Sequence, residues 1–182
     1  MNISRYQYWN NILSFGDINK INSIIKKYRK KEDRELKAKN TVKTSTVYQI
    51  KLKNFKEILD TALSAIVENN QDNYGYDIYN FSKEMFLNVN IYEKNQEYDW
   101  HNDSDPSNFS DLKLTVLINI SEKKFKGGEF FLLGSKEPTS VPELSNPGSM
   151  VVFNSFVLHK VNPVLEGTRK TLTIFVKGPC FK

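Results

Sequence analysis

Both histidines of this chain stand where they could bind a metal ion. His101 is followed two residues later by Asp103, and His159 closes the apolar run Met150–Leu158. Arg169 comes ten residues after His159. Two imidazoles and one carboxylate form the facial triad that holds non-haem Fe(II) and leaves other coordination positions open. The pattern therefore predicts an iron site that can take a co-substrate and oxygen.

Arg169 supplies the positive charge that such a site needs for an acidic co-substrate. A guanidinium can bind the far carboxylate of 2-oxoglutarate through two parallel hydrogen bonds. In an extended strand Arg169, Thr171 and Thr173 share one face, whereas Lys170 points the other way. We therefore expect Arg169 rather than Lys170 to face the metal, with the two threonines able to line the same pocket.

Each of these residues also has a plainer explanation. A single histidine at a strand end is usually a hydrogen-bonded surface or core residue. Asp105 lies four residues from His101 and competes with Asp103 as a ligand, although a position before proline suits a loop. Arg169 could form a surface ion pair after a turn. Because His101 and Asp103 share one face of an extended segment, the joint pattern favours the metal site.

Composition bounds the kind of protein. A length of 182 residues fits one domain, and an aromatic content of 13% argues against disorder. No apolar stretch approaches the roughly 18 residues of a membrane span, and the N-terminus lacks a secretory pattern. The single Cys180 excludes an internal disulfide and a cysteine-based metal site. We expect a protein of the reducing cytoplasm.

Positive charge gathers in the first third of the chain. Residues 1–60 carry 14 Lys and Arg against 6 Asp and Glu, most densely between Lys26 and Lys43. Such a cluster could bind nucleic acid or an acidic partner. Lys and Arg also suit a solvated helix end followed by a loop. The segment lacks the repeated aromatic interleaving that stacks single-stranded bases, so a nucleic-acid partner is disfavoured.

Helical periodicity precedes a series of short strands. Asp17 is expected to cap a helix that runs to about Tyr28, and Asn54 to cap a second helix. Between them Thr44–Leu52 alternates like a strand, whereas Asn69–Tyr79 reads as a loop or short strand. Seven short strands are then expected at Met85–Tyr92, Glu97–His101, Lys113–Ile120, Glu129–Leu133, Ser149–Asn154, His159–Val161 and Arg169–Val176.

This order of elements predicts an α+β fold that is mainly β. Helices followed by short strands favour a single domain, 1–182, with a jelly-roll or cupin-like core. Residues 1–84 would form a helical support region, and residues 85–182 the catalytic core. Gly127-Gly128 reads as a turn or bulge within that core. Ligands bind in the mouth of such barrels, toward which side chains project from several strands.

Four motifs resemble one enzyme family. They are YDWHND, FKGGEF, PGSMVVFNSFVLHKVNPVLEGTR and the closing TIFVKGP. The run from Tyr92 to the C-terminus resembles the 2-oxoglutarate- and Fe(II)-dependent oxygenases, specifically the prolyl 4-hydroxylase-like group with the PKHD-type hydroxylases. The helical first half agrees only in general plan. The resemblance implies a double-stranded β-helix flanked by helices.

Carried over by position, the resemblance assigns the site residues. His101, Asp103 and His159 become the ligands of Fe(II), and Arg169 binds the C5 carboxylate of 2-oxoglutarate. Tyr92 matches a tyrosine that often hydrogen-bonds this carboxylate in relatives, although an inward tyrosine can equally be a packed core residue. The family uses 2-oxoglutarate and O2 as co-substrates, with ascorbate as an accessory reductant. Thr171 is a further candidate for the co-substrate pocket.

The implied reaction couples decarboxylation of 2-oxoglutarate, giving succinate and carbon dioxide, to hydroxylation of a C–H bond. The leading substrate is a prolyl residue of a protein or peptide. Related barrels act on other amino acids and on nucleobases, so the fold alone does not decide. Trp100 could stack on the substrate or merely form the barrel wall, and loops Asn69–Tyr79 and Ser104–Asp111 could read it. A non-catalytic sensor of 2-oxoglutarate or oxygen is the alternative class, which an intact ligand set disfavours.

Overall fold

The computed structural model describes residues 6–29, 36–37, 43–104, 111–134 and 137–180. Its helices are α1 (Phe15–Arg29) and α2 (Lys56–Asn69), with shorter helical turns η1 (Leu52–Asn54), η2 (Asn70–Tyr74) and η4 (Pro142–Ser145). Its strands are β1 (Tyr6–Trp9), β2 (Leu36–Lys37), β3 (Thr46–Lys51), β4 (Phe86–Tyr92), β5 (Tyr98–His101), β6 (Leu112–Asn119), β7 (Lys126–Gly127), β8 (Phe130–Leu133), β9 (Pro138–Ser140), β10 (Met150–Asn154), β11 (His159–Val161), β12 (Val164–Glu166) and β13 (Arg169–Lys177).

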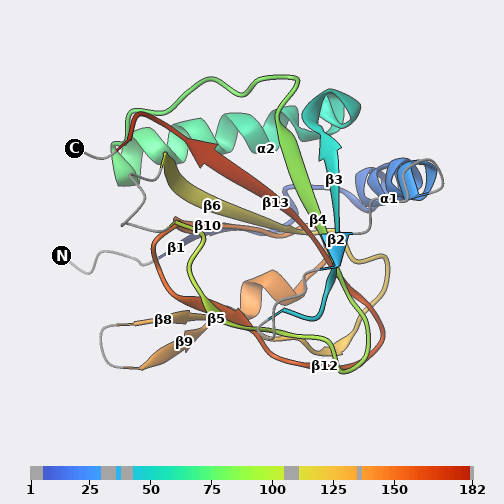
Figure 1. Cartoon of the computed structure of the whole chain (residues 1–182). Coiled ribbons are helices and arrows are strands. Elements are labelled where there is room, and N and C mark those ends of the chain that lie inside the picture. The colour runs from blue at the N-terminus through green and yellow to red at the C-terminus, as the bar shows by residue number, and fades with distance from the viewer. Residues whose placement is uncertain (1–5, 30–35, 38–42, 105–110, 135–136, 181–182) are drawn as a thin grey trace.

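Two sheets face each other and form the body of the molecule (Figure 1). The larger sheet has the order β1-β10-β6-β13-β4-β3-β2, and the smaller one β5-β11-β8-β9. From β4 onward the chain alternates between them, since β4, β6, β10 and β13 lie in the larger sheet and β5, β8 and β11 in the smaller. A short β12-β7 pair completes the strands. This winding is a double-stranded β-helix, so the predicted α+β, mainly β fold is confirmed.

The larger sheet is covered on both faces. Helix α2 lies along its outer face in Figure 1, and the smaller sheet lies below its inner face. On β13, Leu172, Ile174 and Val176 join the core shared with the helices, whereas Arg169 and Thr171 face the smaller sheet. Strands buried on both faces lose the simple alternation of apolar and polar residues. This explains why β6 is almost wholly buried along its length.

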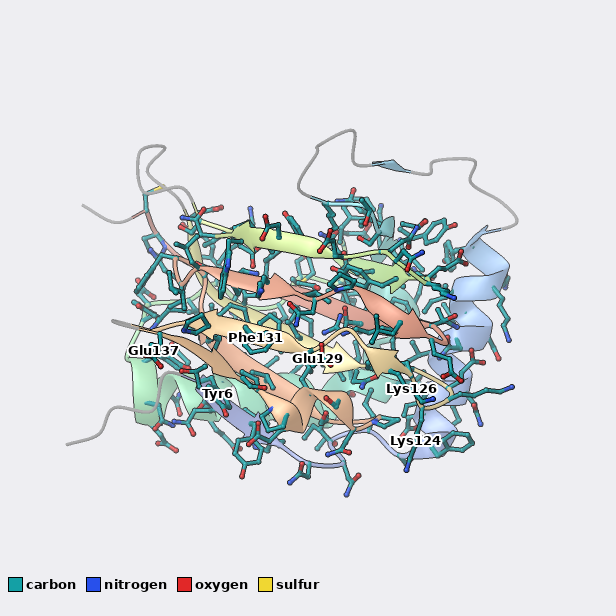
Figure 2. The ribbon with its side chains drawn as sticks, turned by 90° about the horizontal axis from the view of Figure 1, so that it is seen from below. Tyr6, Lys124, Lys126, Glu129, Phe131 and Glu137 are labelled. Atoms are coloured by element: carbon teal, nitrogen blue, oxygen red, sulfur yellow. The ribbon has the colours of Figure 1, made fainter. Side chains whose placement is uncertain are left out.

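The smaller sheet keeps one face in solvent. On β8, Phe130 and Leu132 are buried and contribute to a second apolar core between the sheets. Phe131 between them points outward, and Figure 2 shows it on the surface turned away from the helices. Because successive side chains alternate across a strand, this outward residue fixes which residues of the neighbouring strands point into the barrel.

The seven strands expected from residue 85 onward are all present, with each end within one residue of the prediction. Strand β3 confirms the strand predicted within Thr44–Leu52, whereas β1 and β2 were not predicted; all three come from residues 1–84 and join the larger sheet. The first half of the chain therefore extends the barrel wall as well as covering it. Within the described residues, no helix combines the length and the apolar character that crossing a membrane requires.

Both predicted helix caps were wrong. Helix α1 begins at Phe15, and Ser14 rather than Asp17 caps it: the Ser14 hydroxyl accepts the Asp17 N–H, while the Asp17 carboxylate accepts the Ser14 N–H, each at 3.2 Å. This is the reciprocal capping box, in which the acid stands three residues inside. At α2, Asn54 does not cap; its amide donates to the Lys51 carbonyl and its oxygen accepts the Tyr28 hydroxyl.

Residues 69–79 were expected to form a loop or short strand. Residues 75–79 are irregular, as a loop would be, but residues 69–74 are helical, because α2 continues into the π-helical turn η2, which ends at Gly75, whose φ is 68°. The Tyr74 hydroxyl then donates to the Val152 carbonyl and the Tyr76 hydroxyl to Asn154. Both partners belong to β10, so this segment ties the helical layer to the larger sheet.

Candidate active site

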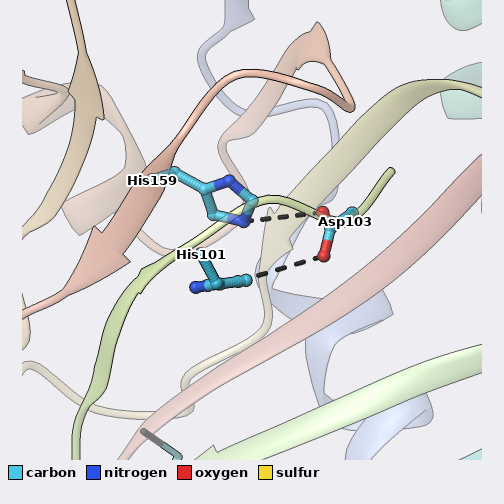
Figure 3. A group of neighbouring side chains, drawn as sticks. All are labelled: His101, Asp103 and His159. Carbon is cyan, nitrogen blue, oxygen red and sulfur yellow. Dashed lines mark ion pairs between the residues drawn. The ribbon is translucent and has the colours of Figure 1, made fainter. Parts of the chain in front are cut away.

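Strand pairing brings the two histidines together. His159 of β11 lies directly opposite His101 of β5, and Asp103 follows β5, where its N–H donates to the Ser155 carbonyl. The Nε2 atoms of His159 and His101 lie 3.5 and 3.9 Å from the two oxygens of Asp103 (Figure 3). One donor atom from each residue lies within 4.8 Å of the others. These three side chains form a donor set of the kind that holds Fe(II).

Backbone carbonyls fix the orientation of both imidazoles. The Nδ1–H of His101 donates to the Asp99 carbonyl at 2.8 Å, and that of His159 to the Val157 carbonyl at 2.9 Å. Each ring thus presents the lone pair of Nε2 toward Asp103. Thr115 on β6 donates its hydroxyl to Asp103 Oδ2 at 2.6 Å and holds the carboxylate in place. The two backbone carbonyls and Thr115 therefore hold the three side chains with their donor atoms convergent.

The surroundings keep the imidazoles neutral. The Tyr98 ring stacks on His101 with centroids 3.3 Å apart, and Phe153 packs edge-on against His159. Burial lowers the pKa of each histidine to about 4. Burial also raises the pKa of Asp103, against the opposing hydrogen bond from Thr115. Neutral imidazoles are the form that binds metals, so the site is ready for a cation at neutral pH.

This environment predicts that the metal-free protein loses stability as the pH falls from about 6.5 to about 4. In that window the unfolded chain protonates imidazoles that the folded protein keeps neutral, so acid favours the unfolded state. We expect thermal unfolding with a chelator to show a falling Tm, with a shallower fall in His159→Gln. Because its pKa is raised, titration of Asp103 changes the stability in the opposite direction, but this contribution is common to the wild type and His159→Gln. Equal slopes for the two proteins would contradict the prediction.

A cavity of about 130 Å³ extends from the triad between the two sheets. The residues around it are Lys43, Asn88, Asn90, Tyr92, Tyr98, His101, Asp103, Leu117, Phe130, His159, Val161, Arg169, Thr171, Thr173 and Phe175. The lining includes every residue that the resemblance assigns to the iron and the co-substrate, whereas Trp100 is not part of it. Most of the lining side chains are polar and converge from both sheets, while Leu117, Phe130, Val161 and Phe175 supply the apolar part of the wall.

Arg169 is a buried part of the wall of this cavity. It is 2% exposed, and the β13–β4 register places it beside Tyr92, with its guanidinium carbon 5.3 Å from that ring. Burial lowers the pKa of Arg169 and raises that of Tyr92. The Nη2 atom of Arg169 has no hydrogen-bond partner among the described residues. A buried guanidinium with a free donor is costly unless an anion binds it.

The side chain of Lys170 points away from the cavity, as the alternation of side chains along the strand predicted. Its Nζ donates to Asn22 and Glu122, at 2.8 and 2.7 Å, and thus lies on the helical face of the sheet. Thr171, two residues after Arg169, is 2% exposed and lines the cavity as expected. Thr173 also lines it and accepts the Asn90 amide at 2.9 Å.

Trp100 lies outside the cavity. It alternates with His101 along β5, and the Nζ of Lys160 stands 5.2 Å from its ring on the outer side of the smaller sheet. Lys160 contacts Phe131 in the same way. This position suits a wall residue and gives no support to contact with a substrate. Asp105, the rival ligand, lies outside the described residues, as do the other residues of 105–110.

Four residues of the site were missed from the sequence: Lys43, Asn90, Tyr98 and Thr115. Asn90 could have been found, because it stands two residues before Tyr92 on the same strand face. Tyr98 stands three residues before His101 in the metal motif. Lys43 was counted with the basic segment, yet its backbone pairs with Tyr98 and its side chain enters the cavity. No local pattern marks it, because only tertiary folding brings it there.

Comparison with known proteins agrees with this geometry. The family model described as the 2OG-Fe(II) oxygenase superfamily matches residues 87–177, which span half of the chain. No curated protein matches the sequence significantly. A Pseudomonas putida prolyl-4-hydroxylase is similar in structure, with a TM-score of 0.75, 16% identity, and coverage of 96% of this chain and 92% of that chain.

Two further solved structures are similar. A prolyl hydroxylase from Trichoplax adhaerens, in complex with a peptide fragment of the hypoxia inducible factor oxygen degradation domain, gives a TM-score of 0.73 at 16% identity, covering 97% of this chain and 84% of that chain. The non-haem α-ketoglutarate-dependent carbocyclase SnoK from nogalamycin biosynthesis gives 0.69 at 13%, covering 97% and 80%. These identities establish the fold alone. Since the family match itself contains His101, Asp103, His159 and Arg169, the chain belongs to the 2OG-Fe(II) oxygenase superfamily.

Proposed function

We propose that this protein is a dioxygenase that uses Fe(II), 2-oxoglutarate and O2 to hydroxylate a prolyl residue of a peptide or protein. The observation that carries the proposal is the free, buried Nη2 of Arg169 in the same cavity as the triad. An acid that spans this cavity would satisfy the guanidinium at one end and reach the metal at the other. The donor set and the orphaned cation therefore fit both iron and 2-oxoglutarate.

Each residue has a defined task in this scheme. His101, Asp103 and His159 would hold the iron, which when bound activates O2 for attack on a C–H bond. Arg169 would bind the C5 carboxylate through two N–H groups, with the Tyr92 hydroxyl as a further donor. Thr171 would line the co-substrate pocket beside it. The apolar walls around Phe130 and Leu117 would keep water away from the reacting atoms.

A peptide substrate has support at the mouth of the cavity. A groove of about 480 Å³ adjoins it, because Asn88 and Phe175 line both spaces. The groove also presents the Gln49 amide and the rings of Tyr79 and Phe86. Aromatic side chains and amides are the groups that bind extended or proline-rich peptides. Two of the similar structures are prolyl hydroxylases, one of them in complex with a peptide fragment.

The test is succinate formation by purified protein with Fe(II), ascorbate, 2-oxoglutarate and air, with and without a library of proline-containing peptides. Succinate that rises with particular peptides, together with a mass increase of one oxygen on proline, is the expected result. A low rate that no peptide stimulates would keep the oxygenase and reject the prolyl substrate. No succinate from protein that binds iron would favour a sensor of 2-oxoglutarate.

A second candidate is an oxygenase of a different substrate, such as another amino acid or a nucleobase. The likeness to the carbocyclase SnoK favours this candidate, because that enzyme has a similar fold and a different activity. We also expect a cytoplasmic location, whose reducing conditions would keep the iron ferrous. Ascorbate should raise the activity for the same reason. Recovery of hydroxylated product from a metabolite mixture, but not from peptides, would select this second candidate.

Gly128 gives a test of the Arg169 pocket that leaves every polar group in place. Its φ is +64°, and a Cβ there would stand 2.9 Å from Arg169 Cδ and 3.1 Å from Val164 Cγ2. We expect Gly128→Ala to weaken 2-oxoglutarate binding and to lower the free energy of unfolding by about 2 kcal/mol or more. Gly75→Ala is the matched control, since its φ is +68° in open space. Equal effects of the two changes, measured by calorimetry and denaturant unfolding, would refute the expectation.

A further inference from the structure

Lys43 is a second cation that lines the cavity. It comes from the first half of the chain, whereas Arg169 begins the last strand, β13. Lys43 precedes β3, and its backbone pairs with Tyr98 at the start of β5. Its Nζ donates to Asn90 Oδ1 at 2.8 Å and stands 4.5 Å from the centre of the Tyr98 ring. Among the described residues, no carboxylate lies within ion-pair distance of it. The ammonium therefore faces the cavity without a counter-ion from the described part of the chain.

The position of Lys43 is held by a chain of contacts. Thr173 accepts the Asn90 amide N–H, which turns the Asn90 oxygen toward the lysine. The Tyr98 ring under the ammonium is the same ring that stacks on His101. Two strands of the larger sheet and one of the smaller thus fix the ammonium beside the histidines. A surface lysine would have no such support.

The two cations line the same cavity and have different neighbours in it. Arg169 contacts Tyr92, whereas Lys43 lies over the ring that covers His101. In support, burial lowers the pKa of Lys43 to about 8, and the charge of Asp103 opposes that effect. The described lining residues thus include two cationic side chains and the single carboxylate of Asp103, which faces both histidines. Two separate cations in one cavity can bind the two carboxylates of a single dianion.

We infer that Lys43 is a positioning residue for the co-substrate, and that its ammonium binds the metal-side C1 carboxylate of 2-oxoglutarate while Arg169 binds the C5 carboxylate. The inference rests on the proposed function. A carboxylate that gives one oxygen to a metal keeps acceptor capacity for a charged donor. Lys43 would thereby orient the 2-oxo acid before oxygen arrives, and the pocket would select dicarboxylates at both ends.

Binding measurements separate the two cations. Calorimetry on Mn(II)-loaded protein would compare 2-oxoglutarate with 2-oxovalerate, which lacks the C5 carboxylate but keeps the 2-oxo acid. Lys43→Met is expected to weaken both ligands by a similar factor, about tenfold or more for a lost charge-assisted hydrogen bond. Arg169→Ala is expected to weaken 2-oxoglutarate and to leave 2-oxovalerate nearly unchanged. Mn(II) affinity should be the same in wild type and Lys43→Met.

Lys160→Met is the matched control, since Lys160 also lies over an aromatic ring but on the outer side of the smaller sheet. It should bind both acids like wild type. Lys43→Arg keeps the positive charge and should retain part of the affinity, which a purely structural role of the stem would not require. If Lys43→Met fails to fold, Lys43→Arg can be compared with the wild type for binding of the two acids instead.

Three outcomes would overturn the inference. Wild-type affinity for both acids in Lys43→Met would remove the lysine from the co-substrate. A loss confined to 2-oxoglutarate would move it to the C5 carboxylate. Unchanged affinity for both acids, with loss of peptide-stimulated succinate, would assign it to the prime substrate. If wild-type protein itself binds neither acid, the proposed function fails, and that result is distinct from the other three.

Discussion

Asp103→Ala is expected to abolish succinate formation while the protein stays folded. The carboxylate is the only acid that the described residues bring to the two histidines, and its oxygens lie 3.5 and 3.9 Å from their Nε2 atoms. Its loss should weaken Fe(II) or Mn(II) binding by more than about 100-fold. Losing a residue that only supports a metal ligand costs about 10- to 100-fold, and losing a ligand itself should cost more. A buried carboxylate without metal is costly, so its removal should barely change the Tm.

Asn102→Ala is the control for this change, because Asn102 is its exposed neighbour and carries no ligand atom of the cluster. Calorimetric titration of metal and a succinate assay would be run on both variants. Full activity in Asp103→Ala would show that the carboxylate is misassigned, and Asp105 would be the next residue to replace.

Arg169→Ala is expected to raise the Kd for 2-oxoglutarate by roughly 100-fold or more, the cost of truncating one partner of a buried charge pair. Arg169 is 2% exposed, and its Nη2 has no hydrogen-bond partner among the described residues. Metal binding should persist, since the Arg169 guanidinium packs against Tyr92 and forms no hydrogen bond or ion pair with His101, Asp103 or His159. A titration of succinate formation against 2-oxoglutarate, with direct calorimetry, would measure the change.

Lys170→Ala tests the strand-parity argument directly. Lys170 is adjacent in sequence but donates to Asn22 and Glu122 on the helical face. Its loss should leave the 2-oxoglutarate requirement unchanged and affect stability alone. If Arg169→Ala kept the wild-type requirement and the change at Lys170 or Lys177 raised it, the co-substrate pocket would have to lie elsewhere.

Much of the barrel could be predicted because its longer strands carry their own signals. Apolar runs such as β10 and β13 are bounded by turn residues, and their parity separates Arg169 from Lys170. The pairing of His101 with His159 depends on the tertiary fold, and the motifs indicate it only through their resemblance to the oxygenase family. The order of the strands in each sheet was likewise beyond local pattern.

The missed elements share a physical reason. Strands β1, β2, β7, β9 and β12 are two to four residues long, a length at which a period is a weak signal, although β5, β8 and β11 were predicted at the same length. Their pairing is decided by neighbours distant in sequence. The Asp17 prediction failed because the acid of a capping box resembles a cap itself, and only the geometry identifies Ser14. Lys43 was read as one charge of a basic segment because its cavity is formed by strands that follow it.

The carbonyl groups that hold the two imidazoles have an evolutionary consequence. Any amino acid at position 99 or 157 provides the same carbonyl to His101 or His159. The ring orientation is therefore insensitive to side-chain replacement at those two positions. Mutations around the mouth can accumulate without turning the histidines away from the metal. A barrel built in this way can acquire new substrates while its metal chemistry is inherited unchanged.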